Sequence, residues 1–189
     1  MKRIIFTAAA ALSLSFAHAV EVEGFKFDDT LKLGNGDLVV NGTGVRSKFG
    51  KRYAMALYVP AKAGDAKGVL SQKGPKRIAI NLIKDVDGDT FAGAVTKGIN
   101  NNSSDAEQAA LKDRVKQLSD TVNALGEIKA KSSIVFDWIP EKGTILTING
   151  QQKGKEITGE DFYNALLKVW LGEDPVQNDL KQGLLGKAG

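Results

Sequence analysis

The order of strand-like and helical segments limits the possible folds of this chain more than any other feature. Residues 20–60 and 77–83 read as strands and tight turns, and residues 89–125 read as two helices. Strands return at 133–148, and helices at 158–185 close the chain. Blocks of strands followed by blocks of helices are typical of α+β domains. The order predicts a large, mostly antiparallel sheet with helices packed on one face.

Three local patterns make the strand predictions specific. Tyr53 to Val59 is a nearly continuous apolar run, and its length suits a buried strand better than a helix. Arg77 to Ile83 reads as another central strand. Residues 133–139 and 144–148 are β-rich, and the following Asn149-Gly150 predicts a tight hairpin into a further strand.

Helix boundaries are marked by polar residues. Ser104-Asp-Ala-Glu107 is a capping-box pattern at the start of a long amphipathic run. An earlier helix over 89–99 is expected to end in a polar loop, Asn100 to Ser103. Thr158-Gly-Glu-Asp161 is expected to cap the next helix, and Asp174-Pro175 to start a short final one.

The N-terminus has the three parts of a secretory signal peptide. Met1-Lys2-Arg3 is basic, residues 4–16 are apolar, and Ala17-His18-Ala19 places small residues around a cleavage site. The alternative, a transmembrane anchor, needs about 20 apolar residues, and acidic Glu21 follows here at once. We expect cleavage after Ala19, export to a bacterial periplasm, no transmembrane segment, and a single domain over residues 20–189.

Composition excludes several classes of chemistry. The sequence has no cysteine, and its one histidine, His18, lies in the predicted signal. The mature part therefore cannot hold a Ser-His-Asp triad, a thiol nucleophile, a Cys/His zinc site or a histidine ligand to haem. The formal charge of +4 falls by two when Lys2 and Arg3 are removed, and the other charges are mixed in sign. Nothing in this pattern indicates a nucleic-acid partner.

Two short motifs resemble cofactor or metal sites only in part. Gly42-Thr-Gly-Val-Arg46 lacks the third glycine of a dinucleotide fingerprint, since Ser47 stands there, and no βαβ unit follows. Its glycines are better explained by crowding in a strand that bends. Asp85-Val-Asp-Gly-Asp89 has its glycine too early for a calcium loop, and Thr96 replaces the bidentate glutamate. We expect a solvated helix entry at this segment, and no cofactor or metal.

Arg46 stands in a predicted strand among apolar and glycine neighbours. An arginine that faces inward there needs a partner, because a buried unpaired charge is costly. An outward-facing surface arginine is the ordinary alternative. The residue pattern by itself leaves both readings open.

Four segments together resemble the chalcone isomerase superfamily, and most closely its bacterial, signal-bearing chalcone isomerase-like branch. They are Asn41-Gly-Thr-Gly-Val-Arg46, Lys51-Arg-Tyr-Ala-Met-Ala-Leu-Tyr-Val59, Ala165-Leu-Leu-Lys-Val-Trp-Leu-Gly-Glu173 and Asp179-Leu-Lys181. The likeness runs in the same order over nearly the whole mature chain. It implies an open-faced β-sandwich, in which helices cover a large antiparallel sheet and a ligand cleft lies between helices and sheet.

The resemblance also implies roles for particular residues. Arg46 matches the arginine with which chalcone isomerases stabilise a developing phenolate and related plant fatty-acid-binding proteins hold a carboxylate. Tyr53 replaces a water-ordering threonine of the isomerases and matches a tyrosine of the fatty-acid-binding branch. Phe91 stands where the isomerases have a tyrosine, Gly98 where they have an asparagine, and Val169-Trp170 where they have a polar and an aliphatic residue. Four of the five catalytic positions therefore depart from the enzymes.

These departures lead to three functional hypotheses. If Phe91, Val169 and Trp170 line the cleft rather than a plain core, the cleft is apolar and suits an acyl chain, with Arg46 and Tyr53 as donors to a carboxylate. The first hypothesis is a periplasmic, non-catalytic binding protein for a fatty acid or similar apolar carboxylate. The second is an intramolecular lyase or isomerase that uses Arg46 as electrophile and Tyr53 as acid or water-orienter. The third is an envelope interaction protein with a vestigial cleft. The sequence specifies no protein partner.

Overall fold

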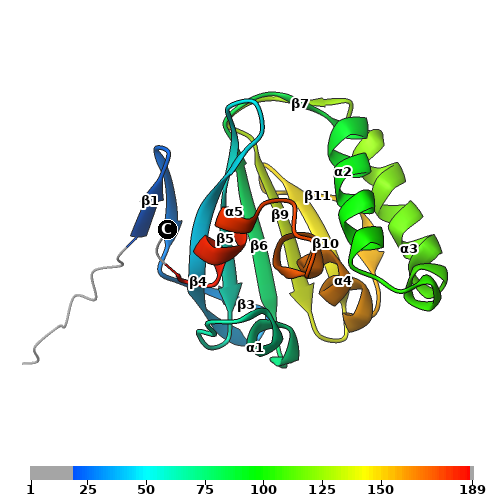
Figure 1. The fold of residues 1–189 in the computed structure, drawn as a ribbon, viewed down its shortest axis with the longest axis horizontal. Coiled ribbons are helices and arrows are strands. Elements are labelled where there is room, and N and C mark those ends of the chain that lie inside the picture. The colour runs from blue at the N-terminus through cyan, green and yellow to red at the C-terminus, as the bar shows by residue number, and fades with distance from the viewer. Residues whose placement is uncertain (1–18, 188–189) are drawn as a thin grey trace, which may run out of the picture.

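A seven-stranded antiparallel sheet forms the centre of the protein in the computed structural model, which describes residues 19–187 (Figure 1). The order across the sheet is β11-β10-β9-β6-β5-β4-β3. The strands are β3 (Thr30–Leu33), β4 (Gly36–Ser47), β5 (Lys51–Val59), β6 (Lys76–Leu82), β9 (Ser133–Ile139), β10 (Gly143–Ile148) and β11 (Gln151–Ile157). All neighbouring pairs are antiparallel. The predicted signal peptide, apart from Ala19, lies outside the described residues.

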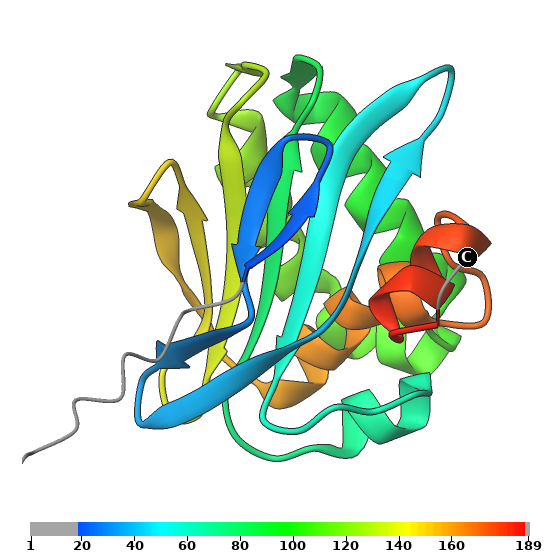
Figure 2. The same cartoon turned by 90° about the vertical axis from the view of Figure 1, so that its left-hand side faces the viewer.

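The helices pack on one face of the sheet, and a β-hairpin lies against the other (Figures 1 and 2). The helices are α1 (Ala66–Ser71), α2 (Gly88–Asn101), α3 (Asp105–Asn123), α4 (Glu160–Leu171) and α5 (Asn178–Leu184). The hairpin consists of β1 (Ala19–Val22) and β2 (Phe25–Asp28), and a short pair, β7 (Val86–Asp87) with β8 (Glu127–Ile128), lies beside the start of α2. Within residues 19–187, no helix has the length and hydropathy required to cross a membrane. The predicted α+β open-faced sandwich is confirmed.

Strand β6 shows how the sheet contributes to two cores. Ile78, Ile80 and Leu82 are buried toward the helices and belong to one large cluster that includes much of α2 and α4. Ala79 points to the other face, where it packs against the smaller cluster that includes Phe27 of the β1–β2 hairpin. Each fully buried Ile or Leu contributes about 1.5–3 kcal/mol. A one-residue shift of β6 would exchange the two sets, so burial fixes the register.

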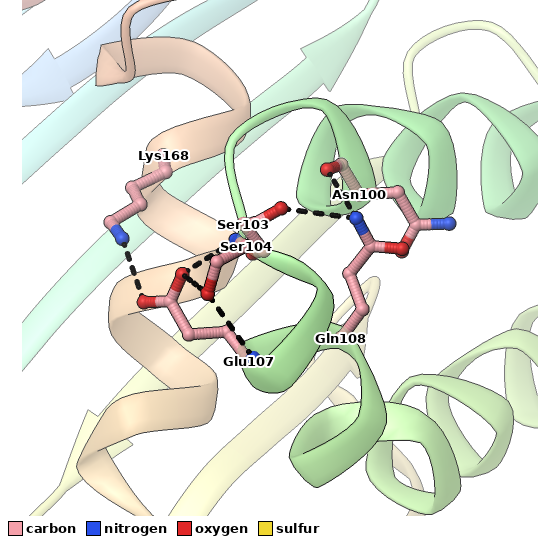
Figure 3. A network of polar contacts seen from close by, with 6 residues as sticks. All are labelled: Asn100, Ser103, Ser104, Glu107, Gln108 and Lys168. Atoms are coloured by element: carbon pink, nitrogen blue, oxygen red, sulfur yellow. Dashed lines mark hydrogen bonds and ion pairs between the residues drawn. The ribbon is translucent and has the colours of Figure 1, made fainter.

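The predicted capping box forms at the start of α3, directly after α2 (Figure 3). Ser104 N donates to Glu107 Oε2 at 2.7 Å, and Glu107 N donates to Ser104 Oγ at 3.3 Å. Lys168 of α4 lies 3.5 Å from Glu107 Oε1, so the same carboxylate also connects α3 to α4. Four orphan amides at a helix start need such partners, which explains why the helix begins here.

The prediction of a loop over Asn100 to Ser103 was wrong for its first two residues. Asn100 and Asn101 form the last turn of α2. Gln108 of α3 donates to the carbonyl of Asn100 at 3.1 Å, and Asn101 Nδ2 donates to Asp174 Oδ2 at 2.6 Å. Contacts from neighbouring elements thus outweigh the weak helix propensity of asparagine.

The starts of the last two helices also differ from the sequence-based expectation. Helix α4 follows Gly159, whose φ is 98°, and Thr158 provides no side-chain cap. Helix α5 begins at Asn178 rather than at Asp174. The backbone N–H of Asp174 instead donates to Asn102 Oδ1 at 2.9 Å, which fixes this segment as a loop over the end of α2.

Helix α5 packs on the Asn41-Gly-Thr-Gly44 segment of β4. Asn41 Nδ2 donates to the carbonyl of Leu184 at 2.7 Å, and the Asn41 side chain is buried. A Cβ on Gly42 would collide with a carbonyl oxygen of α5, and one on Gly44 would lie 2.7 Å from Leu180 Cδ1. The glycines are therefore required for close packing of a helix on a strand, which agrees with the predicted crowding.

The acidic segment Asp85 to Asp89 leads into α2, as expected for a helix entry. The Asp85 carboxylate accepts hydrogen bonds from Ala130 N at 2.7 Å and from Lys129 Nζ at 3.2 Å. These bonds, the backbone one first, lower the pKa of Asp85. A side chain on Gly88 would meet a carbonyl oxygen of α3 at 2.5 Å, so the glycine allows α2 to start close to the end of α3.

Candidate functional site

A cavity of about 340 Å3 opens between one end of the sheet and the helices α2 and α4. All five residues predicted to bind a ligand line it: Arg46 from β4, Tyr53 from β5, Phe91 from α2, and Val169 and Trp170 from α4. Ligand pockets in proteins have volumes of about 300–1,000 Å3. The cavity is therefore large enough to hold a small molecule, and the structure brings the predicted residues together around it.

Arg46 and Tyr53 lie directly opposite each other on β4 and β5. Cross-strand partners project from the same face of a sheet with their Cβ atoms about 4.5–5.5 Å apart. The Tyr53 hydroxyl oxygen accepts a hydrogen bond from Trp170 Nε1 at 2.9 Å. Because an indole N–H can only donate, the hydrogen of the phenol stays available for a ligand.

Burial raises the pKa of Tyr53 to about 12, against the smaller, opposite effects of the Trp170 hydrogen bond and the Arg46 charge. The phenol is therefore neutral at physiological pH. A neutral phenol donates a hydrogen bond to an anion, whereas a phenolate would repel it. The pair thus presents one permanent positive charge and one neutral donor to the cavity.

Arg46 is oriented by Gln177, a residue that the sequence reasoning missed. Arg46 Nη1 donates to Gln177 Oε1 at 3.0 Å and to the carbonyl of Ser47 at 2.8 Å. Gln177 Oε1 also accepts from Ser47 N at 2.8 Å, and Gln177 Nε2 donates to Val45 O at 3.2 Å. The glutamine therefore fixes the end of β4 as well as the guanidinium.

The guanidinium of Arg46 retains unused donors. Both of its hydrogen bonds start from Nη1. Among residues 19–187, the arginines that pair with carboxylates are Arg77 and Arg114, with Asp137 and Asp161. A guanidinium has five N–H donors in a planar fork, so the edge formed by Nε and Nη2 is free to bind a carboxylate. Arg46 thus lines the cavity without a carboxylate partner among residues 19–187.

The inner wall of the cavity is apolar. Phe91 stacks on Phe136 with ring centroids 6.5 Å apart and an interplanar angle of 8°. Val169 and Trp170 are each 1% exposed. Gly98 does not line the cavity: a Cβ there would lie 2.7 Å from Val169 Cγ1, so the glycine permits close contact between α2 and α4. An asparagine at this position would need Val169 to move.

The mouth of the cavity carries an excess of positive charge. Lys48, Arg52 and Lys84 line it together with the acidic Asp85 and Asp87. Asp85 is already bound by Lys129, as described above. The mouth therefore favours an anionic ligand over a cationic one. Sequence reasoning did not find this group, because only the fold brings residues 48–52 next to residues 84–87.

A larger depression, of about 730 Å3, lies between α1 and the ends of α2 and α4. It is more open to solvent and contains none of the five predicted residues. Its rim includes Lys67, Lys168 and Lys181, but no aromatic side chain. We place the candidate site in the smaller cavity, where an apolar wall and an uncompensated cation meet.

An antiparallel sheet covered by helices, with an apolar cavity that ends in an arginine and a tyrosine, defines a small α+β cleft protein. The profile of the chalcone isomerase-like family matches residues 19–186, and the chain belongs to that family. The crystal structure of a fatty-acid binding protein from Arabidopsis thaliana is similar, with a TM-score of 0.65 at 14% sequence identity. The match covers 89% of this chain and 96% of that chain, and at this identity it shows a common fold. No curated protein matches the sequence.

Proposed function

We propose that this protein binds a fatty acid or similar apolar carboxylate in the cavity, without catalysis, after export to the periplasm. The observation that carries the proposal is the pair of cross-strand neighbours Arg46 and Tyr53, which present free donors at an apolar cavity. A guanidinium fork matches the two oxygens of a carboxylate, and the phenol supplies another donor. The structural likeness to a plant protein named for fatty-acid binding supports this choice of ligand.

The cavity volume suggests which part of the ligand is enclosed. A water molecule occupies about 30 Å3, and a methylene group is of similar size. A volume of about 340 Å3 then encloses on the order of ten chain atoms. Longer acyl chains would extend through the mouth past Lys48 and Lys84.

The test is native mass spectrometry of the processed protein purified from its own cells, followed by denaturing extraction of bound molecules. We expect an acyl carboxylate in the wild type and its loss in Arg46→Ala, with affinity for added fatty acid lower on the order of tenfold or more. Arg46→Lys keeps the charge but loses the fork, and should fall between the two. Arg114→Ala, an arginine change on α3 outside the cavity, is the matched control and should retain the ligand. Equal acyl content in wild type and Arg46→Ala would contradict the proposal.

An intramolecular lyase or isomerase is the second candidate, because Arg46 and Tyr53 are also suited to stabilise a developing oxyanion. Phe91 and Val169, however, offer no polar group to the cavity, so a flavonoid-like substrate would leave its oxygens unpaired. The deciding assay measures turnover of a chalcone and of enoyl compounds. Activity no greater than that of Arg46→Ala would remove this candidate.

The third candidate is an interaction protein with a vestigial cleft. A closed, packed interior would support it. The open volume beside Arg46 supports a ligand site instead. If the purified protein is empty and takes up no added fatty acid, the interaction role replaces the binding role.

A further inference from the structure

The turn between β4 and β5 exposes a phenylalanine to solvent. Phe49 is 89% exposed, and it is the one large hydrophobic side chain of residues 19–187 in the exposed class. Figure 2 shows this turn as the projecting upper right end of the sheet. An aromatic side chain in water gains none of the free energy of burial, so packing within this protein does not explain the residue.

The backbone of the turn is unfavourable for a bulky residue as well. Phe49 has φ 54°, in the left-handed region, where glycine is strongly preferred because it lacks a Cβ. The turn is closed by Lys48 N, which donates to the carbonyl of Gly50 at 3.0 Å. A left-handed backbone at a bulky residue costs conformational free energy, and strain of this kind clusters at binding and switch sites.

Four cationic residues surround Phe49. Lys48 belongs to the same turn, and Lys51 and Arg52 are the first two residues of β5. Lys84 Nζ lies 3.3 Å from the position of a Cβ on Gly50. Only Lys51 has an acidic partner in the described chain, Glu23 of the β1–β2 turn, at 2.7 Å. The surface around the exposed aromatic ring is therefore positively charged.

We propose that this turn docks the protein on an anionic phospholipid surface, with Phe49 inserted at the acyl boundary and the cations on the lipid headgroups. Interfacial binding combines a small inserted apolar group with basic residues that each attract anionic lipid. A protein interface fits less well, because it buries about 800 Å2 on each partner around an apolar centre. Phe49 stands alone among charged residues, which suits a bilayer that accepts a single side chain.

If the β4–β5 turn docks on the membrane, the cavity mouth faces the lipid. Lys48, Arg52 and Lys84 belong both to the turn surface and to the mouth. The inference goes beyond ligand binding and stands independently of it, since phospholipid vesicles without free fatty acid test it.

The experiment is flotation of the processed protein with vesicles of phosphatidylcholine alone or mixed with phosphatidylglycerol. We expect flotation only with the anionic vesicles, and a loss on raising the salt concentration. Phe49→Ser should release the protein, and Lys48→Glu with Lys84→Glu should weaken binding by on the order of fivefold per cation or more. Lys142→Glu, a charge change in the β9–β10 turn at the other end of the sheet, should have no effect.

Three results would overturn the proposal. The first is absence of flotation with anionic vesicles at low salt. The second is equal flotation of Phe49→Ser and wild type, which would reduce the effect to charge adsorption. The third is a concentration-dependent dimer, detected by sedimentation velocity and abolished by Phe49→Ser, which would assign the turn to self-association.

Discussion

Gln177 Oε1 accepts a hydrogen bond from Arg46 Nη1 at 3.0 Å, across 131 positions of sequence. The contact joins the loop before α5 to the end of β4, at the cavity. It leaves the other guanidinium edge free, and it is neutral, so the charge of Arg46 remains available to a ligand. The proposed carboxylate site therefore predicts that the charge of residue 177 controls anion binding.

Replacement of Gln177 by glutamate should abolish acyl binding without unfolding the protein. A carboxylate at this position would pair with Arg46 and neutralise it, while it could still accept from Ser47 N. We expect a melting temperature close to that of the wild type, because the new ion pair offsets the lost donation from Gln177 Nε2 to Val45 O, and a loss of fatty-acid affinity on the order of tenfold. Gln177→Ala is the control: it removes the orientation but adds no charge, and should weaken binding less. If Gln177→Glu binds fatty acid as the wild type does, Arg46 is not the ligand's partner.

Alkaline titration should show that the three tyrosine side chains ionise at higher pH than free tyrosine does. Burial is the main cause that raises the pKa of Tyr53 and Tyr58 to about 12, and it raises that of Tyr163 well above its usual range. In the unfolded chain a tyrosine titrates near 10. The folded protein then holds protons that the unfolded chain has lost, so stability is full below pH 10 and falls as the pH rises toward 12. Tyrosinate absorbance and urea unfolding midpoints measure this, and Tyr53→Phe should reduce the fall. Tyrosinate formation near pH 10 in the folded protein would contradict the burial.

Gly98→Ala should destabilise the protein through a single contact. The added methyl would lie 2.7 Å from Val169 Cγ1, and overpacking of this kind costs about 1–3 kcal/mol. Val169→Ala should partly relieve the strain, so the double variant should be less destabilised than the sum of the two. Gly93→Ala is a matched control on the same helix, where a methyl meets nothing within 4 Å, and should stabilise by about 0.5–1 kcal/mol. Urea unfolding of the four variants tests this, and strict additivity would exclude the contact.

Asn41→Leu should loosen α5. The change removes the donor to Leu184 O and the acceptor of Ala63 N, both of which lie within 3 Å of the asparagine side chain. Unsatisfied buried backbone groups cost about 1–3 kcal/mol. Hydrogen exchange should rise in residues 178–184, while Asn35→Ala, a change of an exposed asparagine in the β3–β4 turn, should alter stability by less than about 0.5 kcal/mol. Unchanged hydrogen exchange in α5 would show that its packing against Gly42 and Gly44 is sufficient to keep the helix in place.

Lys76 is a buried cation that the proposed site does not use. Its side chain is 0% exposed, and Nζ lies 3.5 Å from Glu160 Oε1 without a geometrically sound hydrogen bond. Burial lowers the pKa of Lys76 more than Glu160 raises it. Lys76→Met should therefore leave stability unchanged or raise it by about 1–4 kcal/mol, since Glu160 keeps its pair with Lys73. Lys73→Met, on the exposed side of the same carboxylate, should change stability little. A large loss in Lys76→Met, seen in urea unfolding, would show that the buried pair is net stabilising.

The sequence predicted the layers of the fold because its signals are local. The apolar run 53–59, the Asn149-Gly150 turn and the capping box at Ser104 each specify their own segment, and the structure has all three. The prediction errors lie where contacts between residues far apart in the sequence determine the local structure. Asn101 is helical because of its bond to Asp174, which no local pattern shows.

The candidate site was predictable only in part, and for a similar reason. Arg46 and Tyr53 were found through the family resemblance, which carries positions from one protein to another. Gln177 was not, because a glutamine in a loop has no periodicity and no charge to mark it. The mouth cations Lys48 and Lys84 look like ordinary surface lysines until the fold places them on one rim.

The packing of α5 on β4 has a consequence for biosynthesis. Asn41 and Leu184 are 143 positions apart, so the contact cannot form until residue 184 has been made. Chains emerge from the ribosome N-terminus first, and early segments begin to fold before the end is complete. The cavity, whose Arg46 is oriented by the loop before α5, is therefore finished last.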